Sequence, residues 1–405
     1  MPLKKLSRNT QRSLDDQQAT ATISRRGAGR LNEGYVWVYR SDVISPPVAA
    51  PLYLTRVVDE RGKFLGTALY SSASQIALRM LSTAEVKDLG SLLGSRIEAA
   101  IDYRNRLVRD SDAYRVVFSE ADFLPGLIVD RYNELVSLQI LTQAMEAAPV
   151  RESVVATLRE RLQPAAIIER VEPRVRELEH LAPRDSGLVY GEKLSTVFTM
   201  NGVRFHYNAL RGQKTGAFLD QRENYAAAAK FAHGAALDLF CYNGGFALHL
   251  AERCISVAGV DSSRPALEVA DRNAELNGRE IEWIEANAFD LLRDYAVAGR
   301  QYGTVVLDPP AFAKSKRNLE TAFRGYKELN LRAMKMLRPG GILITCSCSY
   351  HVSQADFISV LAEAGCDSRK SLRVLEVRGQ SKDHPVLLNV PETSYLKCVI
   401  LSVSD

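Results

Sequence analysis

The C-terminal half of the sequence predicts an α/β protein with a doubly wound, mostly parallel sheet. From about Val197 onward, short apolar runs alternate with stretches that repeat apolar residues at helical spacing. Such alternation is typical of parallel strands joined by crossover helices. One apolar run, which begins at Ala236, leads into an acidic residue, an aromatic residue and two adjacent glycines. This order is typical of the first strand and turn of such a sheet.

Length and composition limit the class of protein. The chain has 405 residues, of which 46% are hydrophobic and 25% are charged, and this favours two to three globular domains. Since no apolar run approaches the length of about 18 residues that would span a membrane, we expect no membrane segment. The six cysteines and six histidines follow no metal-site or disulfide-scaffold spacing. A cytoplasmic protein without a bound metal is therefore expected.

The beginning of the chain is basic. Residues 1–30 contain seven Lys or Arg residues and two Asp residues, whereas the whole chain has a net charge of +4, so the remainder carries about −1. We predict a flexible basic tail over residues 1–20, which is either an arm for nucleic acid or a solvated segment. It lacks the apolar core of a secretory signal.

Two smaller units precede the α/β half. Alternating apolar residues broken by charged turns predict a β-rich unit over residues 21–95. A bridging helix and a strand–strand–helix–strand pattern predict an α+β unit over residues 96–196, with loops at Pro164, Pro173 and Arg174–His180. The predicted strands are Tyr35–Tyr39, Leu52–Val58, Phe64–Tyr70, Gln75–Met80, Tyr114–Ser119, Leu124–Tyr132, Leu135–Leu141 and Ala166–Arg170, and the predicted helices are Leu89–Asp110 and Val150–Leu162.

The α/β unit extends over residues 197–405. Besides the apolar run at Ala236, its predicted strands are Val257–Val260, Ile281–Glu285, Thr304–Leu307, Ile342–Cys346 and Tyr395–Val403, and its predicted helices are Arg264–Leu276, Phe289–Tyr295, Ala322–Leu337 and Gln354–Ala364.

The stretch Ala236–Phe246 predicts a site for a small ligand, although a plain turn is the alternative. Gly244 and Gly245 let the backbone approach a ligand at a helix N-terminus. Asp261 follows the next apolar run, where a carboxylate suits ribose hydroxyls. The G-x-G-x-x-G fingerprint is absent, and this argues against a dinucleotide and against a nucleotide-dependent oxidoreductase.

Asp308-Pro309-Pro310 follows the predicted strand Thr304–Leu307 at another carboxyl edge of the sheet. The two prolines stiffen the loop and remove N–H donors, which leaves carbonyl groups that accept hydrogen bonds. An acidic side chain beside these carbonyls suits the exocyclic amino group or a protonated ring nitrogen of a nucleobase. A rigid exit from the strand without a ligand is the alternative.

Two cysteines, Cys346 and Cys348, come at the end of the next strand, near Asp308. A partly exposed cysteine in a cleft becomes a nucleophile when its thiolate is stabilised. We expect Cys346 to point into the sheet and the strand to end between the two cysteines, although a core role is the alternative for both. Cys241 is interpreted as loop packing, and Cys254, Cys366 and Cys398 are interpreted as core residues.

Three polar segments lie near these motifs in the sequence. Lys214–Asn224 precedes the first strand and is a candidate lid over the ligand. Lys314, Lys316 and Arg317 follow the two prolines, where contacts with substrate phosphates would position the substrate, and a solvated loop is the equal alternative. His384 lies in a polar loop that is either at the surface or at the cleft.

Together these motifs resemble the 23S ribosomal RNA large-subunit methyltransferase I family, which contains cytosine-5 enzymes. The pattern D-x-F-x-x-x-G-G resembles the S-adenosylmethionine loop of class I methyltransferases. The segments that carry the resemblance are Tyr70–Ile76, Leu124–Arg131, Lys214–Gly216, Asp220–Arg222, the loop Asp238–Phe246, Asp308–Pro310, Gly325–Asn330, Ser347–Ser349 and Asp383–Pro385.

The resemblance implies a PUA-like RNA-binding domain over residues 21–95, a central α+β domain over 96–196 and a Rossmann-like methyltransferase domain over 197–405. It implies S-adenosylmethionine as cofactor, 23S ribosomal RNA as partner, a homodimer and Cys348 as the nucleophile. Cys346 is an additional cysteine beside that motif, and Asn287 replaces the acidic residue that usually meets the adenine amino group. The predicted cofactor-binding residues are Asp238, Phe240, Tyr242, Asn243, Gly244, Gly245, Phe246, Asp261, Asn287, Ala288, Gln221 and Arg222.

The predicted reaction is formation of 5-methylcytosine. Addition of the cysteine thiolate to carbon 6 makes carbon 5 nucleophilic, and Asp308 holds the edge of the ring. The target base must be unpaired or flipped. A first alternative is methylation of an exocyclic amino nitrogen of RNA at the Asp-Pro-Pro loop, which needs no cysteine. A second alternative is a non-catalytic RNA-binding ribosome assembly factor.

Overall fold

The computed structural model describes residues 20–48, 53–210, 216–313 and 315–405. The basic tail predicted over residues 1–20 therefore lies almost entirely outside the described residues. The chain forms two compact units. The first contains the described residues up to Leu107 together with Arg115–Leu194 and Val386–Thr393, and the second contains Val108–Tyr114, Ser195–Pro385 and Ser394–Asp405.

The first unit contains a six-stranded sheet in the order β2-β6-β5-β4-β1-β3. Strands β1 and β4 are parallel, and the pairs β1–β3, β2–β6, β4–β5 and β5–β6 are antiparallel. Buried apolar side chains, among them Ile23, Val57 and Leu78, form its core beside helix α2. The elements are β1 (Thr20–Ile23), α2 (Arg25–Asn32), β2 (Trp37–Tyr39), β3 (Val43–Ser45), β4 (Leu54–Asp59), β5 (Phe64–Tyr70) and β6 (Ile76–Ser82).

The same unit contains a five-stranded sheet in the order β11-β10-β9-β8-β7. Strands β9 and β10 are parallel, and the chain between them includes helix α5, whose residues Val150, Val154, Leu158 and Leu162 are buried. The elements are α3 (Leu89–Leu107), β7 (Ala113–Phe118), β8 (Leu127–Tyr132), β9 (Leu135–Ile140), α4 (Gln143–Glu146), α5 (Ala148–Leu162), β10 (Ala166–Glu169), α6 (Pro173–Leu178) and β11 (Gly187–Gly191).

The second unit is built on a seven-stranded sheet in the order β16-β15-β14-β17-β18-β20-β19. Strands β14 to β18 pair in parallel, and β20 runs antiparallel to both of its neighbours. Chain order reverses between β14 and β17, which is where open α/β sheets bind ligands beyond the carboxyl ends of their strands. The strands are β14 (Ala235–Leu239), β15 (Ser256–Asp261), β16 (Glu282–Glu285), β17 (Tyr302–Leu307), β18 (Leu337–Ser347), β19 (Ser371–Arg378) and β20 (Lys397–Ser404).

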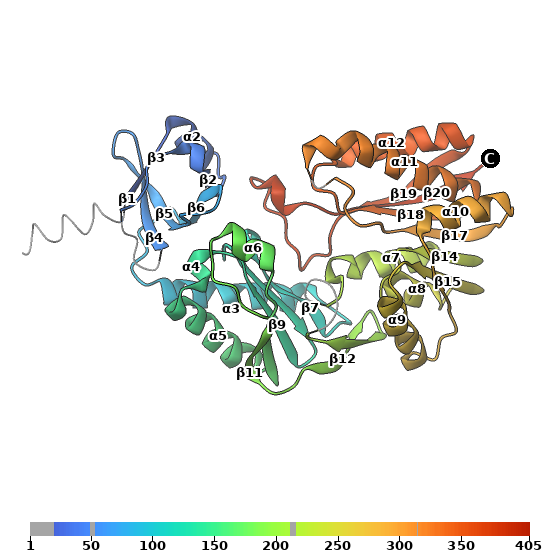
Figure 1. Cartoon of the computed structure of the whole chain (residues 1–405), viewed down its shortest axis with the longest axis horizontal. Helices are drawn as coiled ribbons and strands as arrows, with labels where there is room; N and C mark the ends of the chain where they lie inside the picture. The colour runs from blue at the N-terminus through green and yellow to red at the C-terminus, as the bar shows by residue number, and fades with distance from the viewer. Residues whose placement is uncertain (1–19, 49–52, 211–215, 314) are drawn as a thin grey trace, which may run out of the picture. The chain divides into compact units, whose positions relative to one another are not determined.

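Helices cover both faces of this sheet (Figure 1). Helices α10, α11 and α12 lie on one face, and α7, α8 and α9 lie on the other. A two-stranded ribbon of β12 and β13 precedes α7 and contacts α9. The elements are β12 (Ser195–Met200), β13 (Val203–Asn208), α7 (Arg222–Phe231), α8 (Gly245–Leu250), α9 (Arg264–Leu276), α10 (Ala288–Val297), α11 (Leu319–Lys335) and α12 (Gln354–Ser368).

Most predicted elements are confirmed, because the period of the apolar residues in a long segment distinguishes a helix from a strand. The strand Phe64–Tyr70 and the helix Arg264–Leu276 have the predicted bounds. Several short elements were not predicted, namely β1, α2, β3, α4, α6, β11, β12, β13, α7 and β19. In α2, Arg26 and Arg30 pair with the buried Asp42, so two residues of the basic N-terminal stretch have a structural role.

The loop predicted at Arg174–His180 is wrong, because α6 occupies most of it. Pro173 stands at the start of this helix, a position where proline is tolerated. The interpretation of Cys366 as a core residue is also wrong, since Cys366 is exposed on α12. The domain bounds at residues 95 and 196 remain a prediction. In the described part of the chain, no helix combines the length and the apolar character that crossing a membrane requires.

Candidate cofactor and substrate site

A cavity of about 230 Å³ opens at the carboxyl ends of β14, β15, β17 and β18. Segments that are far apart in the sequence meet there, as the topology of the sheet requires. The lining residues are Phe218, Asp220, Gln221, Tyr225, Phe240, Cys241, Tyr242, Asn243, Gly245, Phe246, Asp261, Ser262, Ser263, Asp308, Pro309, Pro310, Cys348 and Leu396.

The loop between β14 and α8 shapes one side of the cavity. Phe240 and Tyr242 adopt positive φ angles of 65° and 50°, and Gly244 has a φ of 86°. Residues other than glycine rarely adopt positive φ angles, so the loop is a strained turn. A Cβ added at Gly245 would lie 2.5 Å from the Tyr225 hydroxyl oxygen. Glycine at this position therefore leaves room for both the Tyr225 ring and a ligand against the backbone.

Two carboxylates hold this loop. Asp238 is fully buried, and its Oδ2 accepts a hydrogen bond of 2.9 Å from the Ala247 backbone N–H. Burial raises the pKa of Asp238 well above its usual value, and the Ala247 bond acts in the opposite direction. Asp261 lines the cavity, and its two oxygens accept bonds of 3.0 Å from the Tyr242 N–H and 2.9 Å from the Ser263 N–H. Each carboxylate oxygen has a second lone pair, which a ribose hydroxyl could use.

On the other side of the cavity, Asp308 follows β17. Gln221 donates a hydrogen bond of 2.9 Å from Nε2 to Asp308 Oδ2, and Asn224 in turn donates one of 2.7 Å to Gln221 Oε1. Gln221 and Asn224 are both buried. This chain of amides fixes the rotamer of Asp308, whose side chain lines the cavity.

The two cysteines at the end of β18 have different surroundings. Cys346 is fully buried and pairs with Cys398 across β18 and β20, and burial is the main cause that raises the pKa of its thiol well above the usual value. Strand β18 ends at Ser347, and the next residue, Cys348, is half-buried and lines the cavity. The Cys348 Sγ lies 3.9 Å from the Pro309 carbonyl oxygen. The expectation that Cys346 points into the sheet is thus confirmed.

Five of the predicted cofactor-binding residues do not line the cavity. Asn287 is exposed and caps α10, where its Oδ1 accepts bonds from the N–H groups of Phe289 and Asp290. Arg222 is buried and forms an ion pair of 2.9 Å with Asp383. Ala288, Asp238 and Gly244 are the other three. The structure therefore brings together Gln221, Phe240, Tyr242, Asn243, Gly245, Phe246 and Asp261 of the predicted set.

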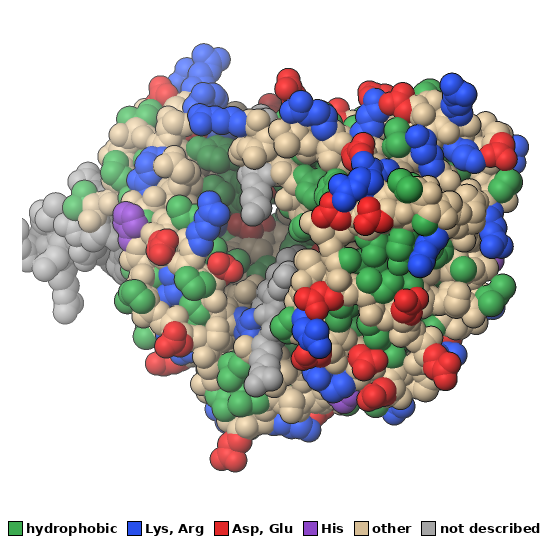
Figure 2. Space-filling view, turned by 45° about the vertical axis from the view of Figure 1, so that its right-hand side comes forward, with side chains coloured by type: hydrophobic (Ala, Val, Ile, Leu, Met, Phe, Trp, Pro, Cys, Tyr) green, Lys and Arg blue, Asp and Glu red, His purple; other side chains and the backbone are tan. Residues whose placement is uncertain are grey.

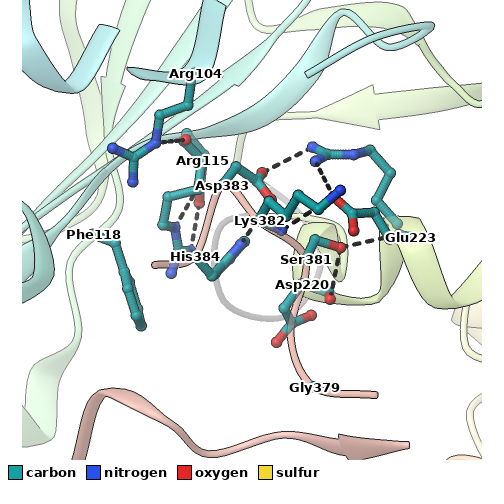
Figure 3. Close-up of polar contacts among 12 residues, drawn as sticks. Arg104, Arg115, Phe118, Asp220, Glu223, Gly379, Ser381, Lys382, Asp383 and His384 are labelled. Carbon is teal, nitrogen blue, oxygen red and sulfur yellow. Dashed lines mark hydrogen bonds and ion pairs between the residues drawn. The ribbon is translucent and has the colours of Figure 1, made fainter. Parts of the chain in front are cut away.

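The segment after β19 packs against η4 (Leu219–Gln221) and the start of α7. The Ser381 hydroxyl donates to the Asp220 carbonyl at 2.9 Å and accepts from the Glu223 N–H at 3.0 Å (Figure 3). The predicted surface or cleft position of His384 is wrong, since His384 is buried beside Asp383 and does not line the cavity. Of the proposed lid Lys214–Asn224, Lys214 and Thr215 lie outside the described residues, and η4 forms a wall of the cavity.

Basic residues give no clear picture of an RNA surface. Lys314 lies outside the described residues, the backbone of Lys316 begins the turn η5 (Lys316–Asn318), and Arg317 is exposed. On the face that Figure 2 shows, Lys and Arg side chains are interspersed with Asp and Glu side chains. The predicted contacts of Lys314, Lys316 and Arg317 with RNA therefore remain a prediction.

Comparison with known proteins identifies the family. A family model described as an S-adenosylmethionine-dependent methyltransferase matches residues 128–400, and a model described as a PUA-like domain matches residues 21–83. The ribosomal RNA large subunit methyltransferase I of Shewanella denitrificans is 36% identical over 357 residues, which cover 86% of this chain and 89% of that protein. The chain belongs to the ribosomal RNA large subunit methyltransferase I family.

Other members and a solved structure agree with this assignment. The ribosomal RNA large subunit methyltransferase I of Photobacterium profundum is 37% identical over 352 residues, which cover 84% of this chain and 88% of that protein. The crystal structure of SMU.776, provisionally classed as a methyltransferase and complexed with SAH, has a TM-score of 0.81 at 18% identity and covers 95% of this chain and 99% of that one. The predicted fold class, a PUA-like domain followed by a methyltransferase domain, is confirmed, and S-adenosylmethionine is the cofactor of this family.

Sequence reasoning missed several residues around the cavity. Asp220, Tyr225 and Leu396 line it; the sequence predicts no site role for Tyr225 or Leu396, and it includes Asp220 only in the candidate lid. Tyr326 and Lys397 lie next to the cysteine turn, as described below. Only Asp220 gave a sequence signal, because it adjoins the predicted Gln221 in a stretch rich in polar residues.

Proposed function

We propose that this methyltransferase forms 5-methylcytosine in large-subunit ribosomal RNA, with Cys348 as the nucleophile. The observation that carries the proposal is that Cys348 and Asp308 line the same cavity as the glycine loop and Asp261. A nucleophile, a carboxylate for a nucleobase and a loop for the methyl donor are therefore within one site. Methylation of carbon 5 by a cysteine enzyme needs these three parts together.

Ribosomal RNA is proposed as substrate for two reasons. The similar proteins of Shewanella denitrificans and Photobacterium profundum are named ribosomal RNA large subunit methyltransferases I. The match of residues 21–83 to a PUA-like domain supports a second contact with RNA. Chemistry on carbon 5 and carbon 6 of a base cannot take place inside a stacked helix, so the target cytosine must leave its helix or lie in an unpaired segment. The predicted homodimer remains a prediction.

S-adenosylmethionine supplies an electrophilic methyl group when it is bound. In this chain the backbone of the loop at residues 240–246 would hold its methionine end, and Asp261 would accept hydrogen bonds from its ribose hydroxyls. The residues fit this ligand because Gly245 keeps the cradle open: it lines the cavity, and a Cβ at this position would lie 2.5 Å from Tyr225, which also lines it.

Cys348 would act on carbon 6 of the cytosine. Its thiolate forms a bond to carbon 6, and the electron pair of the 5,6 double bond makes carbon 5 nucleophilic. Carbon 5 then gains the methyl group, loses its proton to a base, and the recovered electron pair expels the thiolate. Asp308 would accept a hydrogen bond from the amino group or from protonated nitrogen 3, which stabilises the charge that develops on addition.

The test compares two cysteine variants of the full chain. Wild type, Cys348→Ala and Cys346→Ala are incubated with transcribed large-subunit ribosomal RNA and S-adenosylmethionine, and the modified nucleosides are identified by mass spectrometry. We expect 5-methylcytidine from wild type, a loss of at least about a thousandfold in Cys348→Ala, and a rate within about tenfold of wild type in Cys346→Ala.

Two results would contradict the proposal. Formation of 5-methylcytidine by Cys348→Ala at the wild-type rate would remove the nucleophile from position 348. An N-methylated nucleoside as the wild-type product would favour the rival reaction, in which Asp308 and the two prolines hold an amino group and no cysteine takes part. Calorimetric binding of S-adenosylmethionine to each variant separates a lost reaction from a lost fold.

A further inference from the structure

A buried polar cluster lies beneath Cys348. The Tyr326 side chain of α11 is fully buried, and its hydroxyl lies 2.9 Å from both Ser347 Oγ and Ser349 Oγ. These serines are the two neighbours of Cys348 in the chain. Ser349 Oγ also accepts a hydrogen bond of 3.1 Å from the N–H of Ala313, in the loop that begins at Asp308. The cluster therefore fixes the turn that carries Cys348 and ties it to the Asp308 loop.

Lys397 approaches the same turn from the neighbouring strand. It pairs with Ser347 in the antiparallel ladder of β18 and β20, and its Nζ donates hydrogen bonds of 2.6 Å to the Ser349 carbonyl and 2.9 Å to the Tyr395 carbonyl. Lys397 thus contacts the residues on both sides of Cys348. Its side chain is buried, with an exposed fraction of 6% for the residue.

Burying an ammonium group is costly, and this demands an explanation. Burial lowers the pKa of Lys397 to about 8, and the charge of the Cys348 thiolate acts in the opposite direction. The lysine is thus still mostly protonated at neutral pH. The Ser349 and Tyr395 carbonyl groups would also accept hydrogen bonds from a neutral amine. They therefore do not account for a charged lysine, and the ammonium group needs an anion near it.

The charged side chains that the structure describes in the lining of the cavity around Cys348 are acidic. Among the lining residues that the structure describes, the acidic side chains are Asp220, Asp261 and Asp308, and no Lys or Arg is present. The other titratable side chains that line the cavity are Tyr225, Tyr242 and Cys241, and Tyr326 faces the turn from α11. Three carboxylates disfavour a thiolate in the same cavity. Lys397, beneath the turn, supplies the opposite charge.

We propose that Lys397 and Tyr326 are positioning residues for Cys348: the Lys397 ammonium stabilises the thiolate, and the Tyr326 hydroxyl fixes the two serines that flank it. This inference rests on the proposed role of Cys348 as nucleophile. It separates two contributions that act through one cysteine. Lys397 sets the pH range in which the thiolate exists, and Tyr326 sets where the sulfur points.

The first experiment measures alkylation of Cys348 by iodoacetamide between pH 6 and pH 10, with the modified peptide quantified by mass spectrometry. Only the thiolate reacts, so the rate reports its population. In the full-length protein, Lys397→Met should shift the midpoint upward by about one pH unit and lower the rate at pH 7 by about tenfold. Lys335→Met, which removes an exposed lysine at the end of α11, should leave the midpoint unchanged.

Tyr326→Phe is the variant that tests position without charge. It removes both hydroxyl contacts to the serines but no cation. The midpoint of alkylation should stay within about 0.3 pH units of wild type, while kcat for RNA methylation falls by about tenfold at unchanged affinity for S-adenosylmethionine. An unchanged midpoint in Lys397→Met that still binds S-adenosylmethionine, or an unchanged kcat in Tyr326→Phe, would overturn the corresponding part of the proposal.

A second measurement covers the case in which Lys397→Met does not fold. Lysine labelled with carbon-13 at Cε is titrated by NMR in wild type and in Cys348→Ala. The interaction of two charges is reciprocal, so the pKa of Lys397 should be lower in Cys348→Ala than in wild type. Equal values would overturn the charge pairing. Because neither the alkylation nor the NMR titration uses methylation, a failure of the charge pairing is distinguishable from a failure of the proposed reaction.

Discussion

The cavity has two halves that are built in different ways. The cofactor half, formed by the loop at residues 240–246 and by Asp261, takes its shape from backbone conformation and from N–H groups that bind a carboxylate. The cysteine half, formed by Asp308–Pro310 and Cys348, takes its shape from side chains of distant elements, namely Gln221, Tyr326 and Lys397. Substitutions in the first half should therefore change ligand affinity, and those in the second should change the rate of reaction.

Besides the loss expected from Cys348→Ala, the largest expected effect comes from Asp308 in the cysteine half. Asp308→Asn keeps the size of the side chain and its contact distance to Gln221 but removes the negative charge. We expect kcat for RNA methylation to fall by about 100-fold to 1,000-fold, since charge stabilisation in the transition state is lost. The dissociation constant for S-adenosylmethionine, measured by calorimetry, should change by less than about threefold. A large loss of cofactor affinity with normal kcat would contradict the division into two halves.

A smaller effect of the opposite kind is expected from Asp261 in the cofactor half. Asp261→Asn removes a charged acceptor that also holds the Tyr242 and Ser263 N–H groups. Affinity for S-adenosylmethionine should weaken by about 1.5–3 kcal/mol, or roughly tenfold to 150-fold. At saturating cofactor, kcat should stay within about threefold of wild type. Asp261→Ala is the matched variant. If either variant lowered kcat while its affinity for S-adenosylmethionine stayed at the wild-type value, the comparison would fail.

The smallest expected effect is on stability and comes from Gly245. A Cβ added there meets Tyr225 ring atoms at 2.5 Å, whereas one added at Gly29 in α2 meets nothing within 4 Å. Gly245→Ala should lower the free energy of unfolding by about 1–3 kcal/mol, because overpacking forces neighbouring side chains to move. Gly29→Ala should be neutral or stabilising by up to about 1 kcal/mol. Thermal denaturation of both variants measures this difference in stability. Equal melting temperatures would show that the loop accommodates the added methyl group without destabilising the protein.

The same difference explains what the sequence could predict. The cofactor half is local: one strand, one turn and one helix follow each other between residues 235 and 250, so their pattern could be recognised. The position of Cys348 and Asp308 in one cavity could also be predicted, because parallel strands end at a common edge. The expectation that Cys346 turns inward followed from the alternation of side chains along a strand.

What could not be predicted depends on contacts between distant residues. Lys397 has the sequence context of an ordinary strand residue, and only the register of β18 and β20 places it beside Ser347. Tyr326 lies on a helix whose buried face contains many apolar residues, so its hydroxyl contacts gave no pattern in the sequence. His384 stood among polar residues and was expected at the surface or the cleft, yet it is buried beside Asp383. Asn287 caps α10 through its amide oxygen, and its contact with adenine stays a prediction.

The most direct measurement is capture of the covalent intermediate. In 5-fluorocytosine, fluorine replaces the carbon 5 proton that a base removes in the last step. The thiolate then cannot be expelled, so the bond between sulfur and carbon 6 persists after methyl transfer. The protein is incubated with S-adenosylmethionine and ribosomal RNA that contains 5-fluorocytosine, then digested and sequenced by tandem mass spectrometry. We predict a nucleotide attached to Cys348. Attachment to Cys346, or no attachment while ordinary RNA is methylated, would contradict the account.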